Sequence, residues 1–195
     1  MEIVNYKTVY FTFGRYQPPT KGHEAHFRAL KTMAGINDWF IFPSPTQGGF
    51  ENPLDLKTKI TYIQKGCPWT RGKVKEPARV TDAGKNNPVV ATIQTLQEAG
   101  YDKCYFVVGS DRLRAFEFTR DGLGRDYSFY DYDIISSGER DADGDTFAIS
   151  GTKMRRAAHA GDFTTFRKGI PRSLSDSDCR SLMNEIKAAL PKDYK

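Results

Sequence analysis

The chain has 195 residues, 38% hydrophobic and 27% charged, which suits one folded domain with its own core and argues against a disordered chain. Its formal net charge of +5 suits an anionic ligand, but the basic residues mostly alternate with acidic ones and form no block typical of nucleic-acid binding. Three widely spaced cysteines argue against a disulfide framework and a zinc site. The sequence also lacks a signal-peptide pattern and an apolar run of transmembrane length. We therefore expect a cytoplasmic protein that binds neither nucleic acid nor a membrane.

Strand-like and helix-like segments alternate along the chain. Short apolar runs predict strands at residues 9–13, 38–42, 78–81, 104–108 and 131–136. Helical spacing and start signals predict helices at residues 23–33, 54–65, 89–99, 113–118 and 150–159. Two further helices are expected to be capped by Asp162 and Asp176, and the last of them reaches about Leu190.

This alternation predicts a Rossmann-like α/β fold, in which a doubly wound, mostly parallel sheet carries helices on both faces. We expect residues 1–170 to form this domain and residues 171–195 to form a short helical C-terminal extension packed on it. Parallel sheets bind ligands at the carboxyl ends of their strands. The Gly/Pro-rich stretch 66–77 and the polar stretches 122–130 and 138–145 are predicted to be surface loops, either plain connections or part of a lid or substrate rim.

The turn after the first strand carries a set of residues suited to phosphate. It reads Gly-Arg-Tyr-Gln-Pro-Pro-Thr-Lys-Gly-His from Gly14 to His23. Gly14 permits a tight turn, and Gly22 gives clearance between Thr20 and His23. If the helix begins near Thr20, the hydroxyl and the imidazole face the same way, beside the partial positive charge of the helix N-terminus. An ordinary capped helix start is the alternative. His26, one turn later, either helps to bind phosphate or has a packing or surface role.

A second candidate anion site opens the helix predicted at residues 150–159. Its sequence is Ile-Ser-Gly-Thr-Lys-Met-Arg, from Ile149 to Arg155. Ser150 or Thr152 can cap the helix, beside the small Gly151, and free backbone N–H groups there can face an anion. Arg155 lies one turn further, where its guanidinium can bind a phosphate with two hydrogen bonds. Ordinary capping explains this segment by itself, but together with the first motif it predicts a clamp for a triphosphate.

These two motifs resemble those of the (H/T)xGH nucleotidyltransferase superfamily. The longer first motif is most similar to nicotinamide-mononucleotide (NMN) adenylyltransferases, including the small forms encoded by bacteriophages. This chain departs from their usual loop at Pro19, where an aromatic residue is typical, and at Thr20, where a histidine is typical. The resemblance covers roughly residues 8 to 170. For a phage-encoded protein it implies a location in the cytoplasm of the host.

Weaker similarities continue between the two motifs. Asn52-Pro53-Leu54 resembles the loop that follows the second strand, and Lys59 falls where relatives often carry an arginine that reaches the nucleotide phosphates. Gly109 and Asp111 match a Gly-x-Asp turn near the nucleotide, for which a strand end with a capping aspartate is the alternative.

The resemblance implies transfer of the adenylyl group of ATP to NMN, giving NAD and pyrophosphate by direct attack on the α-phosphate. It implies catalytic roles for His23, Thr20 and Arg155. The residues that it implies for nucleotide and phosphate binding are Gly14, Arg15, Tyr16, Gly22, His26, Lys59, Gly109, Asp111, Ser150, Gly151 and Thr152. Mg²⁺ is expected to be held mainly by substrate phosphates rather than by a protein metal site. A cytidylyltransferase acting on another phosphorylated acceptor and a nucleotide-binding regulatory module without turnover are the alternatives. The sequence leaves a homo-oligomer open.

Overall fold

The structure, a computed structural model, describes residues 5–80, 87–138 and 149–194. The chain divides into two units, each built from three segments. The sheet unit consists of Met1–Phe13, His26–Phe42 and Glu76–Glu139. The helical unit consists of Gly14–Ala25, Pro43–Lys75 and Arg140–Lys195. The continuous domain expected over residues 1–170 and the extension over 171–195 stay a prediction.

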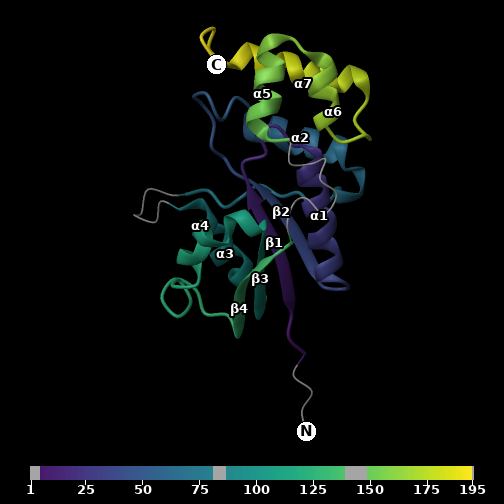
Figure 1. The fold of residues 1–195 in the computed structure, drawn as a ribbon. Coiled ribbons are helices and arrows are strands. Elements are labelled where there is room, and N and C mark those ends of the chain that lie inside the picture. The colour runs from purple at the N-terminus through teal and green to yellow at the C-terminus, as the bar shows by residue number, and fades with distance from the viewer. Residues whose placement is uncertain (1–4, 81–86, 139–148, 195) are drawn as a thin grey trace. The chain divides into compact units, whose positions relative to one another are not determined.

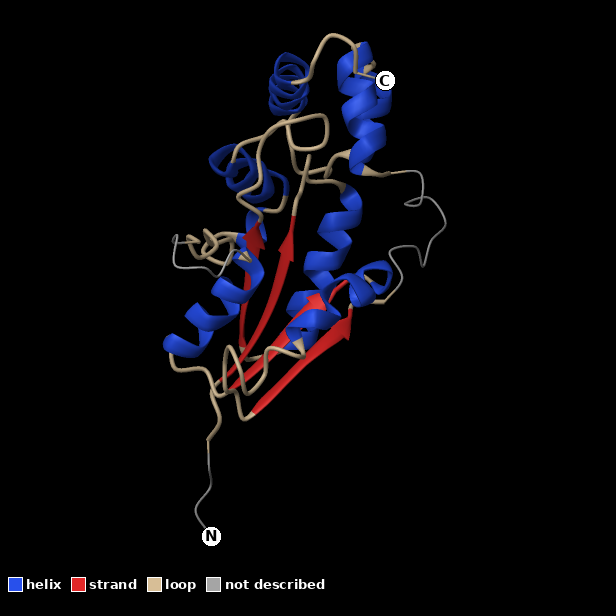
Figure 2. Ribbon diagram, turned by 90° about the vertical axis from the view of Figure 1, so that its left-hand side faces the viewer, coloured by secondary structure: helices blue, strands red, loops and turns tan. Residues whose placement is uncertain are grey.

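Parallel strands form the centre of the sheet unit (Figures 1 and 2). They are β1 (Thr8–Gly14), β2 (Asp38–Pro43), β3 (Lys103–Val108) and β4 (Asp131–Ser136), in the order β2-β1-β3-β4. β1 pairs in parallel with β3, and β3 pairs in parallel with β4, with Val9 opposite Cys104 and Phe106 opposite Ile134. The predicted strands at residues 9–13, 38–42, 104–108 and 131–136 are therefore confirmed. β1 has neighbours on both sides, so the loop that leaves it begins at the switch point of the sheet.

Helices cover both faces of this sheet, as the sequence predicts (Figure 1). On one face, Phe11 stacks on Phe106 with ring centroids 4.5 Å apart, in the same core cluster as Ile93 of α3 (Pro88–Glu98). Phe116 of α4 (Leu113–Phe116) meets the edge of Phe106 there. On the other face, Thr12 meets His26 of α1 (Lys21–Ala34). Alternate residues of β1 thus serve opposite faces, because successive side chains of a strand point to opposite sides.

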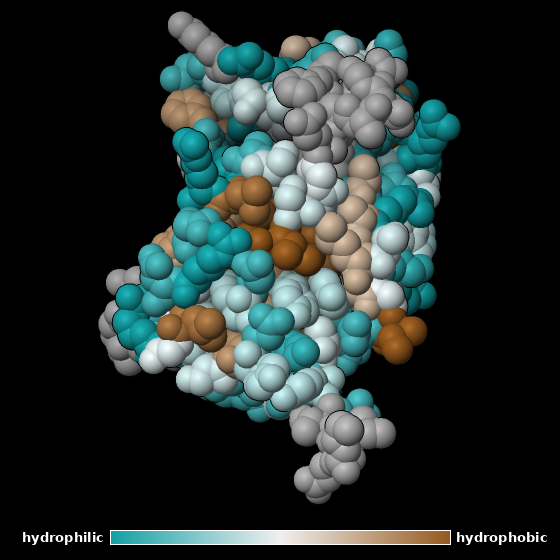
Figure 3. All heavy atoms as spheres, turned by 60° about the horizontal axis from the view of Figure 1, so that its bottom comes forward, coloured by the Kyte–Doolittle hydropathy of each residue, from teal (hydrophilic) through white to brown (hydrophobic). Residues whose placement is uncertain are grey.

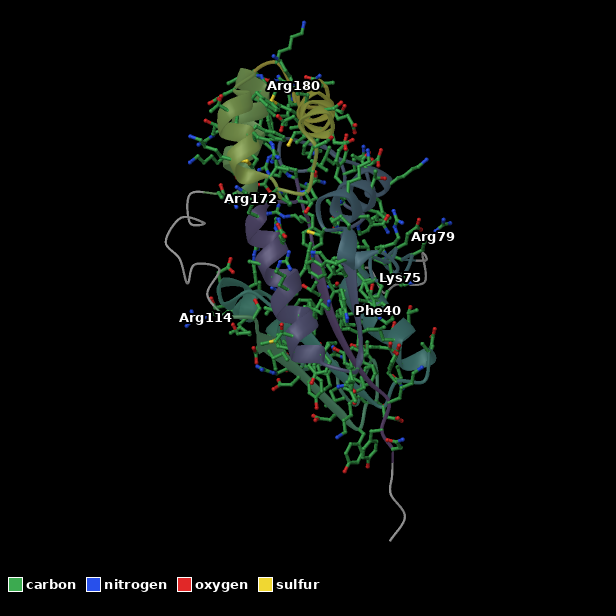
Figure 4. All side chains as sticks on the ribbon, turned by 90° about the vertical axis from the view of Figure 1, so that its right-hand side faces the viewer. Phe40, Lys75, Arg79, Arg114, Arg172 and Arg180 are labelled. Carbon is green, nitrogen blue, oxygen red and sulfur yellow. The ribbon has the colours of Figure 1, made fainter. Side chains whose placement is uncertain are left out.

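The helical unit is built around its own core. Its helices are α2 (Leu56–Gly66), α5 (Gly151–Ala160), α6 (Phe163–Gly169) and α7 (Asp176–Ala189), with a short 3-10 turn, η1 (Pro68–Thr70). Met154, Phe166 and Leu182, at most 1% exposed, lie in one hydrophobic cluster to which α5, α6 and α7 all contribute. Near this cluster the guanidinium of Arg180, labelled in Figure 4, lies 3.8 Å from the ring centroid of Phe163.

The N-caps of α5, α6 and α7 are residue types that commonly cap helices, and one of them lies one residue before its predicted position. Ser150 and Asp162 are the N-caps of α5 and α6, as predicted. The prediction that Asp176 caps the last helix is wrong by one residue, since Ser175 is the N-cap and its Oγ accepts the N–H of Asp178 at 3.0 Å. Asp176 is the first helical residue instead, and its carboxylate accepts a hydrogen bond from Arg167 Nε at 2.7 Å.

The strand predicted at residues 78–81 is wrong over its described part. Residues 78–80 form no strand, and Thr81 lies outside the described residues. The N–H of Ala78 donates instead to the hydroxyl of Thr92 on α3, at 3.3 Å. A side-chain hydroxyl is therefore the acceptor, where in a strand it would be a backbone carbonyl of a neighbouring strand. Of the predicted loops, residues 122–130 contain an isolated β-bridge between Leu123 and Tyr127, and residues 139–145 of the loop 138–145 lie outside the described part.

The surface carries scattered apolar side chains. On the face shown in Figure 3, teal and white residues predominate and the brown ones lie in separate groups. Phe40 of β2, labelled in Figure 4, is partly buried and packs against the core of the sheet unit. Within residues 5–80, 87–138 and 149–194, no helix combines the length and the apolar character needed to cross a lipid bilayer.

Candidate active site

A threonine–histidine pair stands at the start of α1. The helix begins at Lys21, and the N–H of Glu24 donates to the carbonyl of Thr20 at 3.0 Å. His23 folds back, so that its Nδ1 accepts the backbone N–H of Thr20 at 3.0 Å and lies 3.0 Å from the hydroxyl of the same residue. Because Nδ1 accepts from a backbone N–H, a neutral His23 ring carries its proton on Nε2. The imidazole is therefore oriented as a hydrogen-bond donor through Nε2.

The turn before this pair is shaped by Tyr16. Tyr16 has a left-handed backbone, with φ of 47°, and its side chain is only 3% exposed. Its ring meets the His23 ring edge-on, with centroids 5.0 Å apart. A Cβ on Gly14 would lie 2.7 Å from the Tyr16 ring, so glycine is required to leave room for it. Gly14 thus contributes to the site indirectly, by leaving space for the Tyr16 ring that packs against His23.

Arg155 joins the two sequence motifs within the helical unit. Its side chain is 7% exposed, and its Nη1 donates to the carbonyl of Gln17 at 2.9 Å. Nη2 donates to the hydroxyl of Thr152 at 3.1 Å, while Ser150 Oγ accepts the N–H of Lys153 at 3.1 Å as the helix cap. A Cβ on Gly151 would lie 2.9 Å from the Gln17 carbonyl oxygen. Glycine is therefore needed where the start of α5 meets the first motif.

Gln17 is a site residue that the sequence reasoning missed. It is 4% exposed and makes two hydrogen bonds of 2.9 Å with the backbone of Leu54, one through each end of its amide. The side chain thereby satisfies a buried N–H and a buried carbonyl, as a neighbouring strand would. It ties residues 14–20, called loop 14–20 here, to residues 44–54, called loop 44–54. The only available signal was its place between Tyr16 and Pro18 in the motif.

Lys59 of α2 is bonded to the chain itself. It is fully buried, and its Nζ donates to the backbone carbonyls of Ser44 and of Thr46, the latter at 3.2 Å. Burial lowers the pKa of the Lys59 ammonium from its usual 10.5 to about 8, partly offset by the charge of Asp55. The contact with nucleotide phosphates implied by the sequence stays a prediction, and the observed bonds give Lys59 a role in holding loop 44–54.

This burial predicts a pH dependence of stability. Between pH 8 and 10.5 the unfolded chain keeps the Lys59 proton that the folded chain loses, so Lys59 makes the free energy of unfolding rise with pH in this window. Replacing Lys59 by methionine should remove that rise. The free energy of unfolding of wild type minus that of Lys59→Met should therefore be larger at pH 10 than at pH 7.5. Urea unfolding at the two pH values measures it.

The exposed Lys57 on the same helix supplies the matched control, Lys57→Met, which also exchanges a lysine for an apolar side chain. An equal pH-dependent shift for both variants would contradict the assignment to Lys59.

The remaining predicted residues lie in both units. Arg15 is exposed and paired with Glu51 of loop 44–54 at 2.5 Å. His26 belongs to the sheet unit, where Nε2 lies 2.7 Å from the hydroxyl of Thr12 and Nδ1 lies 2.8 Å from that of Ser137. Gly109 precedes the 3-10 turn η2 (Ser110–Arg112), which contains Asp111. The structure therefore places His26, Gly109 and Asp111 in the sheet unit, and the other predicted site residues in the helical unit. Their roles toward a nucleotide stay predictions.

Comparison with known proteins supports the resemblance found in the motifs. No family model matches the chain. The probable nicotinate-nucleotide adenylyltransferase of Sulfurimonas denitrificans is 31% identical over 127 residues, which is 60% of this chain and 60% of that protein. The chain thus matches less than two thirds of the length of this curated relative.

Solved structures show the fold. A Vibrio parahaemolyticus protein assigned as a nicotinate-nucleotide adenylyltransferase has a TM-score of 0.58 at 16% identity, over 91% of this chain and 99% of that one. The nicotinic acid mononucleotide adenylyltransferase of Plasmodium falciparum has a TM-score of 0.57 in its complex with APC, at 16% identity, over 97% and 99% of the two chains. The predicted Rossmann-like α/β fold is therefore confirmed. The chain resembles nicotinate-nucleotide adenylyltransferases in sequence over part of its length and shares its fold with these structures.

Proposed function

We propose that the protein transfers the adenylyl group of ATP to a pyridine mononucleotide and releases pyrophosphate. The observation that carries this proposal is the contact of Arg155 with the carbonyl of Gln17 at 2.9 Å, which brings the first motif to the start of α5. Two helix N-termini, those of α1 and α5, then belong to one unit of the chain together with His23 and Thr20. Helix N-termini favour phosphate, because their free N–H groups and dipoles attract negative charge.

In this proposal a phosphate oxygen of the acceptor attacks the α-phosphorus in line with the bond that breaks. The new P–O bond joins the two nucleotides, and pyrophosphate leaves with the electron pair of the broken bond. Negative charge spreads over the non-bridging oxygens in the transition state. His23 donates a hydrogen bond from Nε2 to one of these oxygens, and Thr20 holds the ring through Nδ1. The protein thus contributes orientation and charge stabilisation.

The triphosphate tail is assigned to the start of α5. Ser150, Gly151 and Thr152 present the first backbone N–H groups of a helix that runs from Gly151 to Ala160. Arg155 has further N–H groups besides the three that bond to the protein, and these can meet the β- or γ-phosphate. Mg²⁺ would be bound mainly by the substrate phosphates and water, since it keeps several waters and is commonly bound through phosphates.

The acceptor is proposed to be NMN, because the motif from Gly14 to His23 most resembles NMN adenylyltransferases. Nicotinate mononucleotide is the second candidate. It is favoured by the relatives, which are named for nicotinate nucleotide or nicotinic acid mononucleotide, one of them in complex with NaAD.

An assay of purified protein with Mg²⁺, each NTP and each acceptor tests the proposal. Pyrophosphate release and the dinucleotide product are measured with NMN, with nicotinate mononucleotide and with phospho-alcohols. NAD formed from ATP and NMN faster than any other product is the expected result. Faster formation of the nicotinate product would replace NMN by the second candidate. Transfer from CTP to a phospho-alcohol, or nucleotide binding without pyrophosphate release, would overturn adenylyl transfer to a pyridine nucleotide.

A further inference from the structure

The guanidinium of Arg155 is fixed from three sides. Besides its bonds to Gln17 and Thr152, Nε donates to the hydroxyl of Tyr194 at 3.2 Å. Each guanidinium nitrogen therefore has a protein acceptor, and these acceptors come from loop 14–20, from α5 and from the segment after α7. Because a guanidinium is planar and rigid, an acceptor at Nε sets the direction in which the other two nitrogens point.

Tyr194 is held in place by packing. Its side chain is 9% exposed and belongs to the hydrophobic cluster of the helical unit. Its ring stacks on Phe50 of loop 44–54 with centroids 6.1 Å apart, and lies 5.7 Å from the ring of His159 on α5. The backbone N–H of Tyr194 donates to the carbonyl of Pro191 at 3.1 Å, which closes a turn. The hydroxyl therefore points at Arg155 from a packed ring rather than from a loose tail.

Contacts continue from Tyr194 to the candidate catalytic pair. Arg155 holds the backbone carbonyl of Gln17, and the side chain of Gln17 is bonded to Leu54. Gln17 lies only three residues before Thr20, which orients His23. A change at the Tyr194 hydroxyl would therefore be transmitted to the conformation of loop 14–20 through a single intermediate side chain.

We propose that Tyr194 is a positioning residue of the active site. It orients the Arg155 guanidinium so that this group holds the Gln17 carbonyl and keeps loop 14–20 in the conformation that presents Thr20 and His23. This inference deepens the proposed function, and its kinetic consequences rest on that function. The segment after α7, which by the sequence is a packing extension, thereby becomes part of the site.

Replacing Tyr194 by phenylalanine tests this role, because the ring and its packing stay and only the hydroxyl is lost. Amide hydrogen exchange of the peptide covering residues 14–24 is expected to become about threefold faster or more, since a hydrogen bond to a charged group is removed. The kcat/KM for ATP is expected to fall about 5- to 10-fold. Tyr62→Phe is the matched control. It removes another buried tyrosine hydroxyl from the same hydrophobic cluster, one that donates to Glu185 at 2.9 Å.

A double-mutant cycle with Arg155→Lys separates positioning from general stability. Lysine keeps the positive charge but lacks the Nε–H that donates to Tyr194. In that background Tyr194→Phe should change neither the exchange of residues 14–24 nor kcat/KM any further. Equal effects of Tyr194→Phe in both backgrounds, or the same faster exchange in Tyr62→Phe, would overturn the proposal. If wild type shows no transferase activity, the proposed function fails, while the exchange measurements still decide the role of Tyr194.

Discussion

Replacing His23 by alanine is expected to lower kcat for adenylyl transfer by at least about 100-fold, with little change in the KM for ATP, as found when one donor to a developing oxyanion is removed. The imidazole Nδ1 accepts the Thr20 N–H at 3.0 Å, which fixes the orientation of the ring and leaves the proton of a neutral ring on Nε2. A donor of this kind acts most strongly when charge builds up on the α-phosphate, which is why the loss appears in kcat. Steady-state rates of pyrophosphate release measure it.

The exposed Met33, further along α1, supplies the control Met33→Ala, which shortens a side chain on the same helix. The thermal midpoint of His23→Ala should also be compared with wild type, because an unfolded variant would lose activity for another reason. Near-normal turnover in a folded His23→Ala protein would remove His23 from the mechanism.

The second large effect is expected from Gly151→Ala. In most helices alanine in place of glycine stabilises by about 0.5–1 kcal/mol. At Gly151 the added methyl would lie 2.9 Å from the Gln17 carbonyl oxygen and 3.2 Å from Arg155 Nη1. The Gln17 oxygen belongs to the backbone, so it cannot move aside by a change of side-chain rotamer. Overpacking of this kind costs about 1–3 kcal/mol, so the free energy of unfolding should fall despite the better helix former. Urea unfolding measures this change.

Gly22→Ala is the matched comparison for stability. A methyl there would meet only the Thr20 hydroxyl within 4 Å, at 3.7 Å, which is an ordinary contact. We expect Gly22→Ala to be at least as stable as wild type, and to lose nucleotide binding if a phosphate lies over this turn. A Gly151→Ala protein as stable as Gly22→Ala would contradict the close packing of α5 on loop 14–20.

Local patterns were sufficient to predict the strands β1 to β4 of the sheet and the N-caps of α5 and α6. The apolar runs of β1 and β3 and the serine before α5 act on neighbouring residues, so spacing in the sequence predicts them. The strand expected at residues 78–81 shows the limit of this reasoning, because the N–H of Ala78 is satisfied by Thr92, 14 residues away. The start of α7 shows the same limit. Ser175 and Asp176 are both residue types that are preferred at the N-cap, and the sequence does not tell which of them takes that position, whereas in the structure it is Ser175.

The sequence by itself determined the α/β class, the strands of the sheet and the two motifs that begin α1 and α5. These features depend on hydrophobic periodicity and on capping, which act within a few residues. Only the tertiary structure decided how the motifs are connected. Arg155 and Gln17 are 138 residues apart in the chain, and Arg155 and Tyr194 are 39 apart. Such contacts form when distant segments pack together and bury polar groups that must then find partners. For the same reason only the structure assigned Lys59 to the carbonyls of loop 44–54 and Gln17 to the backbone of Leu54.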